Sequence, residues 1–198
     1  NWEIGVEVEK QDLPFLSTAE LSELIRQKEV SPVEVTESYL ERIDDLNFKF
    51  NSYLTVCRKE ALQAAQQAEQ AIAQGNYLGP MHGIPVAVKD QLWTKGIRTT
   101  VGSRFMADFF PEEDATVVTR FKEAGAIVLG KLNMHELAAG ITSISSLGGQ
   151  TRNPYDPSRY PGGSSGGTGA AIAASFASTA AECLRVGLST PSSPSASC

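Results

Sequence analysis

Residues 161–174 read PGGSSGGTGAAIAA, a glycine-rich loop with two adjacent serines that runs directly into a segment of small residues typical of a helix. Glycine lacks a Cβ atom, so its backbone can adopt positive φ angles or let another group approach closely. The first amide groups of a helix have no intrahelical partner, and they favour a negative charge at that end. The stretch therefore predicts a loop that holds either a phosphate or a developing oxyanion beside its serines.

Three known types of glycine-rich loop can be compared with this stretch. A phosphate-binding P-loop ends in Gly-Lys-Ser/Thr, but no lysine follows the glycines here. A dinucleotide-binding turn has the pattern Gly-x-Gly-x-x-Gly, which is absent. Residues 162–166, GGSSG, do fit the Gly-x-Ser-x-Gly nucleophile elbow, but His82 and His135 both precede the serines, and that fold places its histidine after them. The remaining option pairs a serine with a lysine base.

Residues 79–90, GPMHGIPVAVKD, supply a candidate lysine. The apolar and mostly β-branched run over 84–88 predicts a buried strand that ends in Lys89 and Asp90. Burial disfavours the charged form of a lysine, so a lysine at the end of a buried strand can serve as a base at neutral pH. In the alternative interpretation Lys89 simply emerges into solvent beside Asp90, and the local pattern leaves both open.

The N-terminal part of the chain is predicted to be helical. Residues 17–20 (STAE) and 31–34 (SPVE) are capping boxes, and apolar residues follow each of them at helical spacing. Residues 58–74 are rich in Ala, Gln and Glu, and Gly75 and Asn76 end the run, so a third helix is expected there. We expect these helices to serve as scaffold.

Alternation of helix and strand continues further along the chain. A helix is predicted over residues 114–125, with Val117, Val118 and Phe121 facing inward, and an apolar strand over 126–129 follows it. Lys131 then follows this strand as Lys89 follows the previous one. This order favours the α/β class, with helices covering a mainly parallel sheet. Sites in such sheets lie outside the carboxyl ends of the strands.

Composition and charge argue against several classes of function. The formal net charge of −6 argues against nucleic acid or an anionic membrane as a direct partner. No apolar run reaches the roughly 18 residues that a membrane helix needs. The three cysteines show neither metal-ligand spacing nor a disulfide framework, which favours a reducing, cytoplasmic compartment. No metal site and no cofactor are expected.

Four motifs together resemble the amidase signature family of serine hydrolases: GIPVAVKD at 83–90, GKLNMHELA at 130–138, TRNPYD at 151–156 and the glycine-rich stretch at 161–174. The resemblance implies α/β/α layers around a mixed, mainly parallel sheet. It also implies hydrolysis of the C–N bond of small-molecule carboxamides through a Ser–Ser–Lys triad.

The resemblance assigns roles to particular residues. It implies that Lys89 is the base and that Ser164 is the bridging serine, held by a cis peptide bond to the preceding glycine. The residues implied as the supporting loop are Gly162, Gly163, Ser165, Gly166 and Gly167.

The sequence departs from the family pattern from Glu182 onward. The family's nucleophilic serine belongs to a Gly-Gly-Ser turn expected near residues 187–189, and no such turn occurs there. We therefore expect residues 1–181 to be the N-terminal part of an amidase domain and residues 182–198 to be a disordered, Ser/Pro-rich tail outside the family.

Two functions compete on this basis. One is an amidase-type hydrolase, and the alternative is a catalytically inactive fragment that lacks the nucleophilic serine. Ser189 is the serine nearest to the missing turn, but it lacks the glycine pair whose amides would stabilise an oxyanion.

Overall fold

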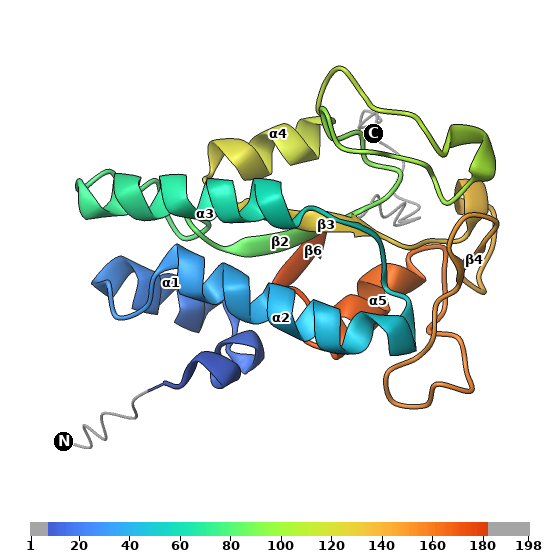
Figure 1. Cartoon of the computed structure of the whole chain (residues 1–198), viewed down its shortest axis with the longest axis horizontal. Coiled ribbons are helices and arrows are strands. Elements are labelled where there is room, and N and C mark those ends of the chain that lie inside the picture. The colour runs from blue at the N-terminus through green and yellow to red at the C-terminus, as the bar shows by residue number, and fades with distance from the viewer. Residues whose placement is uncertain (1–7, 182–198) are drawn as a thin grey trace, which may run out of the picture.

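The structure, a computed structural model, describes residues 8–181 and contains a four-stranded sheet in the order β1-β3-β2-β6 (Figure 1). β2 is parallel to both of its neighbours, β3 and β6, whereas β1 is antiparallel to β3. The sheet is therefore mixed and mainly parallel, as predicted. The strands are β1 (Tyr53–Val56), β2 (Pro85–Lys89), β3 (Ile127–Leu132) and β6 (Thr179–Ala181).

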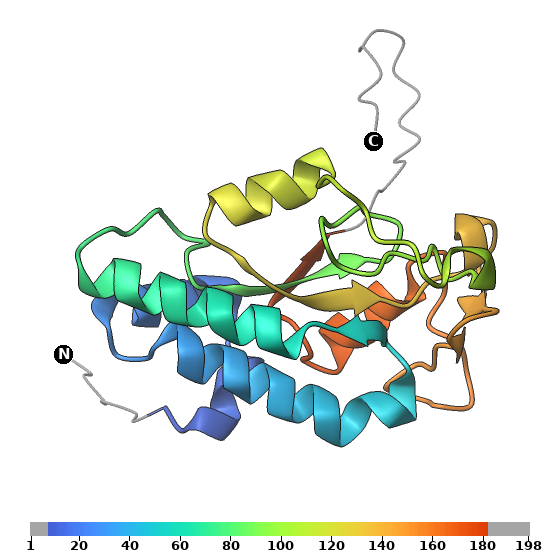
Figure 2. The same cartoon turned by 45° about the horizontal axis from the view of Figure 1, so that its top comes forward.

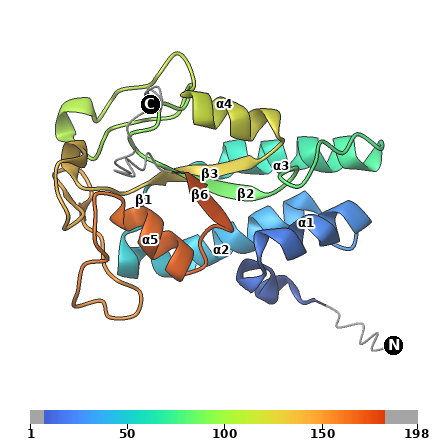
Figure 3. The ribbon, with the colours of Figure 1, turned by 180° about the vertical axis from the view of Figure 1, so that it is seen from behind.

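Helices cover both sides of this sheet. Figures 1 and 3 show α3 and α4 on one side of the strands and α1, α2 and α5 on the other. All five residues of β2 are buried, as expected for a parallel strand with both faces covered. The helices are α1 (Thr18–Gln27), α2 (Pro32–Phe50), α3 (Arg58–Ala73), α4 (Thr116–Glu123) and α5 (Gly166–Ala173), with short 3-10 helices η1 (Lys10–Phe15), η2 (Arg104–Met106) and η3 (Glu136–Ala138).

Both capping boxes are present at the first two α-helices. Ser17 accepts a hydrogen bond from the Glu20 amide, and the Glu20 carboxylate accepts one from the Ser17 amide. Ser31 and Glu34 do the same at the start of α2. Each box satisfies two amide groups that the helix itself leaves unpaired, so the sequence predicts the starts of these helices directly.

Two features of the fold differ from the sequence-based expectation. Val117, predicted to face inward, is 39% exposed, whereas Val118, also predicted to face inward, is fully buried in α4. The polar region 142–160, which has no helical or alternating apolar pattern, contains a small antiparallel hairpin made of β4 (Ile144–Ser145) and β5 (Gly149–Gln150). Strands of two residues are too short to produce an alternating pattern, so sequence periodicity cannot predict them.

The long loops gather at one end of the sheet. Figure 2 shows residues 99–110 and 133–165 together at the end toward which the β3 arrow points. This is the carboxyl end of the parallel strands, where sites in open α/β sheets lie. Within residues 8–181, no helix has the combination of length and apolar character needed to cross a membrane. The predicted tail, residues 182–198, lies outside the described residues.

Candidate active site

Lys89 is the last residue of β2, and its side chain contacts both serines of the glycine-rich loop. The Nζ atom donates hydrogen bonds to Ser164 Oγ at 2.8 Å and to Ser165 Oγ at 2.7 Å. Lys89 is 1% exposed, whereas both serines are partly exposed. The pair of contacts therefore connects a buried amine to hydroxyl groups that solvent or a ligand can reach, and Lys89 does not emerge into solvent.

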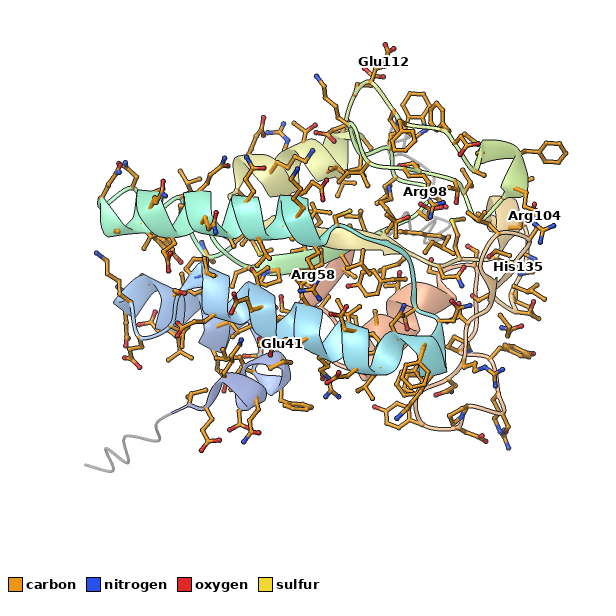
Figure 4. All side chains as sticks on the ribbon, viewed as in Figure 1. Glu41, Arg58, Arg98, Arg104, Glu112 and His135 are labelled. Carbon is orange, nitrogen blue, oxygen red and sulfur yellow. The ribbon has the colours of Figure 1, made fainter. Side chains whose placement is uncertain are left out.

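The main chain of the glycine-rich loop is held by residues that follow β3. The amide of His135 donates to the Ser164 carbonyl oxygen at 2.9 Å, and the amide of Gly167 donates to the Asn133 carbonyl oxygen at 2.9 Å. The peptide bond between Gly163 and Ser164 is cis. Figure 4 labels His135 at the loop-rich end of the molecule. β2, β3 and the start of α5 thus converge on the two serines.

Several glycines of this loop are required by their surroundings. A Cβ atom on Gly167 would lie 2.1 Å from the Asn133 carbonyl oxygen and 2.7 Å from that of Ser52. Gly162 has a φ angle of 96°, a conformation that side-chain-bearing residues rarely adopt. The start of α5 can therefore lie directly against the chain that leaves β3.

Lys131, the second strand-end lysine of the sequence, belongs to a different environment. It lies inside β3 beside Val88, one position before the residue that pairs with Lys89, so its side chain faces the other side of the sheet. Its Nζ donates to the Leu92 carbonyl oxygen and to the hydroxyls of Thr94 and Thr99. Burial lowers the pKa of Lys131 to about 8, although Asp90 opposes the shift.

Replacing Lys131 with methionine is expected to change the dependence of stability on pH. Because folding lowers the Lys131 pKa from 10.5 to about 8, the unfolded chain binds more protons than the folded chain between these values. The Lys131 contribution to the free energy of unfolding therefore rises with pH across this window. Relative to Lys131→Met, the wild-type free energy of unfolding should increase by about 2–3 kcal/mol from about pH 7 to about pH 10. Urea unfolding of both proteins measures this difference, and a constant difference would contradict the assigned environment.

Asp90 fixes the loop that follows β2. Its Oδ2 atom accepts hydrogen bonds from the amides of Thr100 and Gly102, at 2.9 and 3.2 Å, and from the Thr100 hydroxyl. Burial raises the pKa of the Asp90 carboxyl group, while these hydrogen bonds and the Lys131 charge lower it. Asp90 thus anchors the segment adjacent to Lys89 and does not itself contact the two serines.

The side chains of the two histidines make no hydrogen bond to Lys89, Ser164 or Ser165. His82 is buried, and its Nδ1 atom accepts from the Leu78 amide at 3.1 Å. The His135 Nδ1 atom lies 3.3 Å from the Thr142 hydroxyl. Among residues 8–181, no group of three or more His, Cys, Asp or Glu side chains is placed to hold a metal ion.

The candidate site does not coincide with the cavity of about 620 Å³ found in the structure. That cavity lies between α3 and the turn from α4 to β3, and His82 and Lys95 are among its lining residues. Neither Lys89 nor Ser164 lines it. The hydrogen-bonded geometry at the carboxyl end of β2, and not the volume of this cavity, therefore defines the candidate site.

One residue of the site carries no signal in the sequence. The Ser143 hydroxyl bonds to the carbonyl oxygen of Gly162 and to the amide of Gly166, which lie on either side of Ser164. Ser143 is one of several serines in a polar region, and no motif or spacing distinguishes it from Ser145 or Ser146. Its contact depends on how the hairpin packs, which local sequence does not encode.

Comparison with known protein sequences consistently matches this chain to amidases and their relatives. Residues 34–181 match the family model described as Amidase. The chain is 48% identical over 163 residues to a glutamyl-tRNA(Gln) amidotransferase subunit of Moorella thermoacetica, covering 82% of this chain and 34% of that protein. The chain therefore spans about a third of the length of the curated relatives it matches.

Comparison with solved structures also matches this chain to amide-hydrolysing enzymes. A peptide amidase from Stenotrophomonas maltophilia has a TM-score of 0.81 and 36% identity, covering 85% of this chain and 36% of that one. A fatty acid amide hydrolase has a TM-score of 0.82 and 25% identity, covering 86% of this chain and 30% of that one. The similarity extends over most of the described residues in both cases.

Proposed function

Because this chain belongs to the amidase family, we propose that it forms the N-terminal part of a hydrolase that converts carboxamides to the acid and an amine or ammonia. The observation that supports the proposal most directly is the contact of Lys89 Nζ with Ser164 Oγ at 2.8 Å. The family assignment made from the four motifs is confirmed, and it favours the hydrolase over the inactive fragment.

In the proposed reaction Lys89 and Ser164 move a proton. A serine hydroxyl is a weak nucleophile until a base removes its proton. We propose that the neutral amine of Lys89 takes the proton of Ser164, while Ser164 takes that of the attacking serine. The attacking oxygen then forms a bond to the amide carbon. The lysine returns the proton to the leaving nitrogen as the C–N bond breaks, and water later hydrolyses the acyl–enzyme ester.

The attacking serine is the member of the triad that has no assigned residue, because the family's Gly-Gly-Ser turn does not occur in this chain. Ser189 is the serine of this chain nearest to the position that the family pattern gives to the nucleophile. Ser164 and Ser165 also contact the amine directly. An experiment that identifies the serine modified by a serine-directed covalent label therefore decides which hydroxyl the lysine activates.

The proposed substrate is a small-molecule carboxamide. The peptide amidase and the fatty acid amide hydrolase are named for different classes of amide, so the names of the relatives do not select one amide for this chain. The proposed location is the cytoplasm, which a buried free thiol at Cys57 suits.

Incubation of the full chain with a panel of primary carboxamides is expected to release ammonia. The panel should include a short aliphatic amide, an aromatic amide and a C-terminally amidated dipeptide, because the base and bridging serine act on the amide group common to all three. Coupled detection of ammonia measures the rate, with heat-unfolded protein as the control. A folded chain that releases no ammonia from any of the three would instead support the inactive fragment.

A further inference from the structure

Ser143 connects the two sides of the loop that presents Ser164 and Ser165. It lies immediately before β4 and is fully buried. Its Oγ atom donates to the Gly162 carbonyl oxygen at 2.7 Å and accepts from the Gly166 amide at 2.8 Å. A hydroxyl can donate and accept at once, so this one group satisfies main-chain atoms on both sides of the serine pair.

The position of Ser143 is itself fixed by the hairpin. Its carbonyl oxygen accepts from the Thr151 amide at 3.1 Å, and its φ angle of 55° turns the chain into β4. The hairpin therefore delivers the hydroxyl from outside the loop. Both hydrogen bonds come from a residue outside the loop.

Gly166 leaves space for this hydroxyl because it has no side chain. A Cβ atom on Gly166 would lie 2.1 Å from Ser143 Oγ and 2.4 Å from Ser143 Cβ. On the other side of the serine pair, a Cβ atom on Gly163 would lie 3.0 Å from the same oxygen. The glycines thus leave the space that the Ser143 side chain occupies.

We propose that Ser143 is a positioning residue that holds the main chain around Ser164 and Ser165, so that both hydroxyls stay within hydrogen-bonding distance of Lys89. Its catalytic consequence rests on the function proposed above. Lys89 is buried in the interior, whereas the two serines belong to a partly exposed loop. Displacing a reacting group by about 1 Å can cost a factor of about 100 in rate, so the loop needs a fixed point.

Ser143→Ala tests this role, and Ser145→Ala is the matched control. Ser145 is also a buried serine of the hairpin, and its hydroxyl makes two hydrogen bonds, to Asn133 and Gly148, without contacting residues 162–166. We expect Ser143→Ala to lower kcat by about 10- to 100-fold with little change in KM. Amide hydrogen exchange in residues 161–169 should become about 10- to 30-fold faster, because two hydrogen bonds are lost. Ser145→Ala should produce neither change.

A second pair of variants keeps the test independent of folding defects in Ser143→Ala. Gly166→Ala should destabilise the wild-type chain, because its Cβ atom meets the Ser143 side chain. In the Ser143→Gly background that contact is gone, and the nearest remaining atom is Pro161 Cγ at 3.0 Å. The fall in melting temperature caused by Gly166→Ala should therefore be smaller in the Ser143→Gly background.

Hydrogen exchange and melting temperature test this proposal independently of the proposed function. If the wild-type chain hydrolyses no amide, the exchange rates and the melting temperatures still decide whether Ser143 holds the loop. Equal exchange over residues 161–169 in Ser143→Ala and Ser145→Ala would overturn the proposal. An equal effect of Gly166→Ala in both backgrounds would overturn it as well. If exchange changes as expected while kcat stays at the wild-type value, the positioning role is also refuted.

Discussion

Replacing Lys89 with methionine is expected to lower kcat/KM for amide hydrolysis by about 10³-fold, within the range of about 10²- to 10⁴-fold that a general base contributes. Methionine fills a similar buried volume but has no amine for the proposed proton transfer from Ser164. The two serines are partly exposed, so water can replace the lost hydrogen bonds and the fold should persist. Initial rates of ammonia release measure the effect, and thermal unfolding verifies the fold.

Lys131→Met is the matched control for this prediction. Lys131 is also a fully buried strand lysine with three hydrogen-bond acceptors, but its Nζ faces Leu92, Thr94 and Thr99 and not the serines. Its replacement should leave kcat/KM within a few-fold of the wild-type value. Equal losses in the two variants would show that a buried cation matters only for the fold. Full activity in Lys89→Met would remove the lysine from the mechanism.

Replacing Gly167 with alanine is expected to destabilise the chain by about 3 kcal/mol, the upper end of the usual cost of overpacking. The added Cβ would lie 2.1 Å from the carbonyl oxygen and 2.6 Å from the nitrogen of Asn133, and 2.7 Å from the carbonyl oxygen of Ser52. All three are main-chain atoms, which cannot rotate away as a side chain can. The start of α5 must therefore move off the chain that leaves β3. A fall in melting temperature of about 10 °C would report this cost.

Gly169→Ala is the control for the Gly167 variant. Gly169 lies in the same helix, two residues further on, and a Cβ atom there would meet nothing within 4 Å. Alanine is a better helix former than glycine by about 1 kcal/mol, so this variant should keep or raise the melting temperature. If both alanines had the same effect, helix propensity and not the close approach of α5 to Asn133 would explain the requirement for glycine.

The sequence predicts the elements that carry strong local signals. The capping boxes at Ser17 and Ser31 place α1 and α2, and the β-branched run before Lys89 places β2. Each of these signals acts within a few residues of chain, through hydrogen bonds to helix ends or through burial of an apolar run. The class of fold follows from their order.

The rest of the site depends on contacts between distant parts of the chain. Lys89 and Ser164 are 75 residues apart, and the sequence pattern leaves open whether Lys89 points to the loop or to solvent. Lys131 has a similar strand-end pattern but faces the other side of the sheet, because its register differs by one position from that of Lys89. Ser143 reaches the loop through a hairpin whose two-residue strands give no periodic signal. Resemblance to a family supplies the pairing of Lys89 with Ser164, which periodicity cannot.

Covalent labelling by a fluorophosphonate probe is the most direct test of the claim that Lys89 activates a serine in this chain. The probe forms a bond between a nucleophilic serine oxygen and phosphorus, with loss of fluoride, so intact-mass and peptide analysis identify the serine. We expect the folded wild-type chain and Lys131→Met to carry one label each and Lys89→Met to carry none. A folded wild-type chain that takes up no label, or a label that Lys89→Met retains in full, would contradict the account.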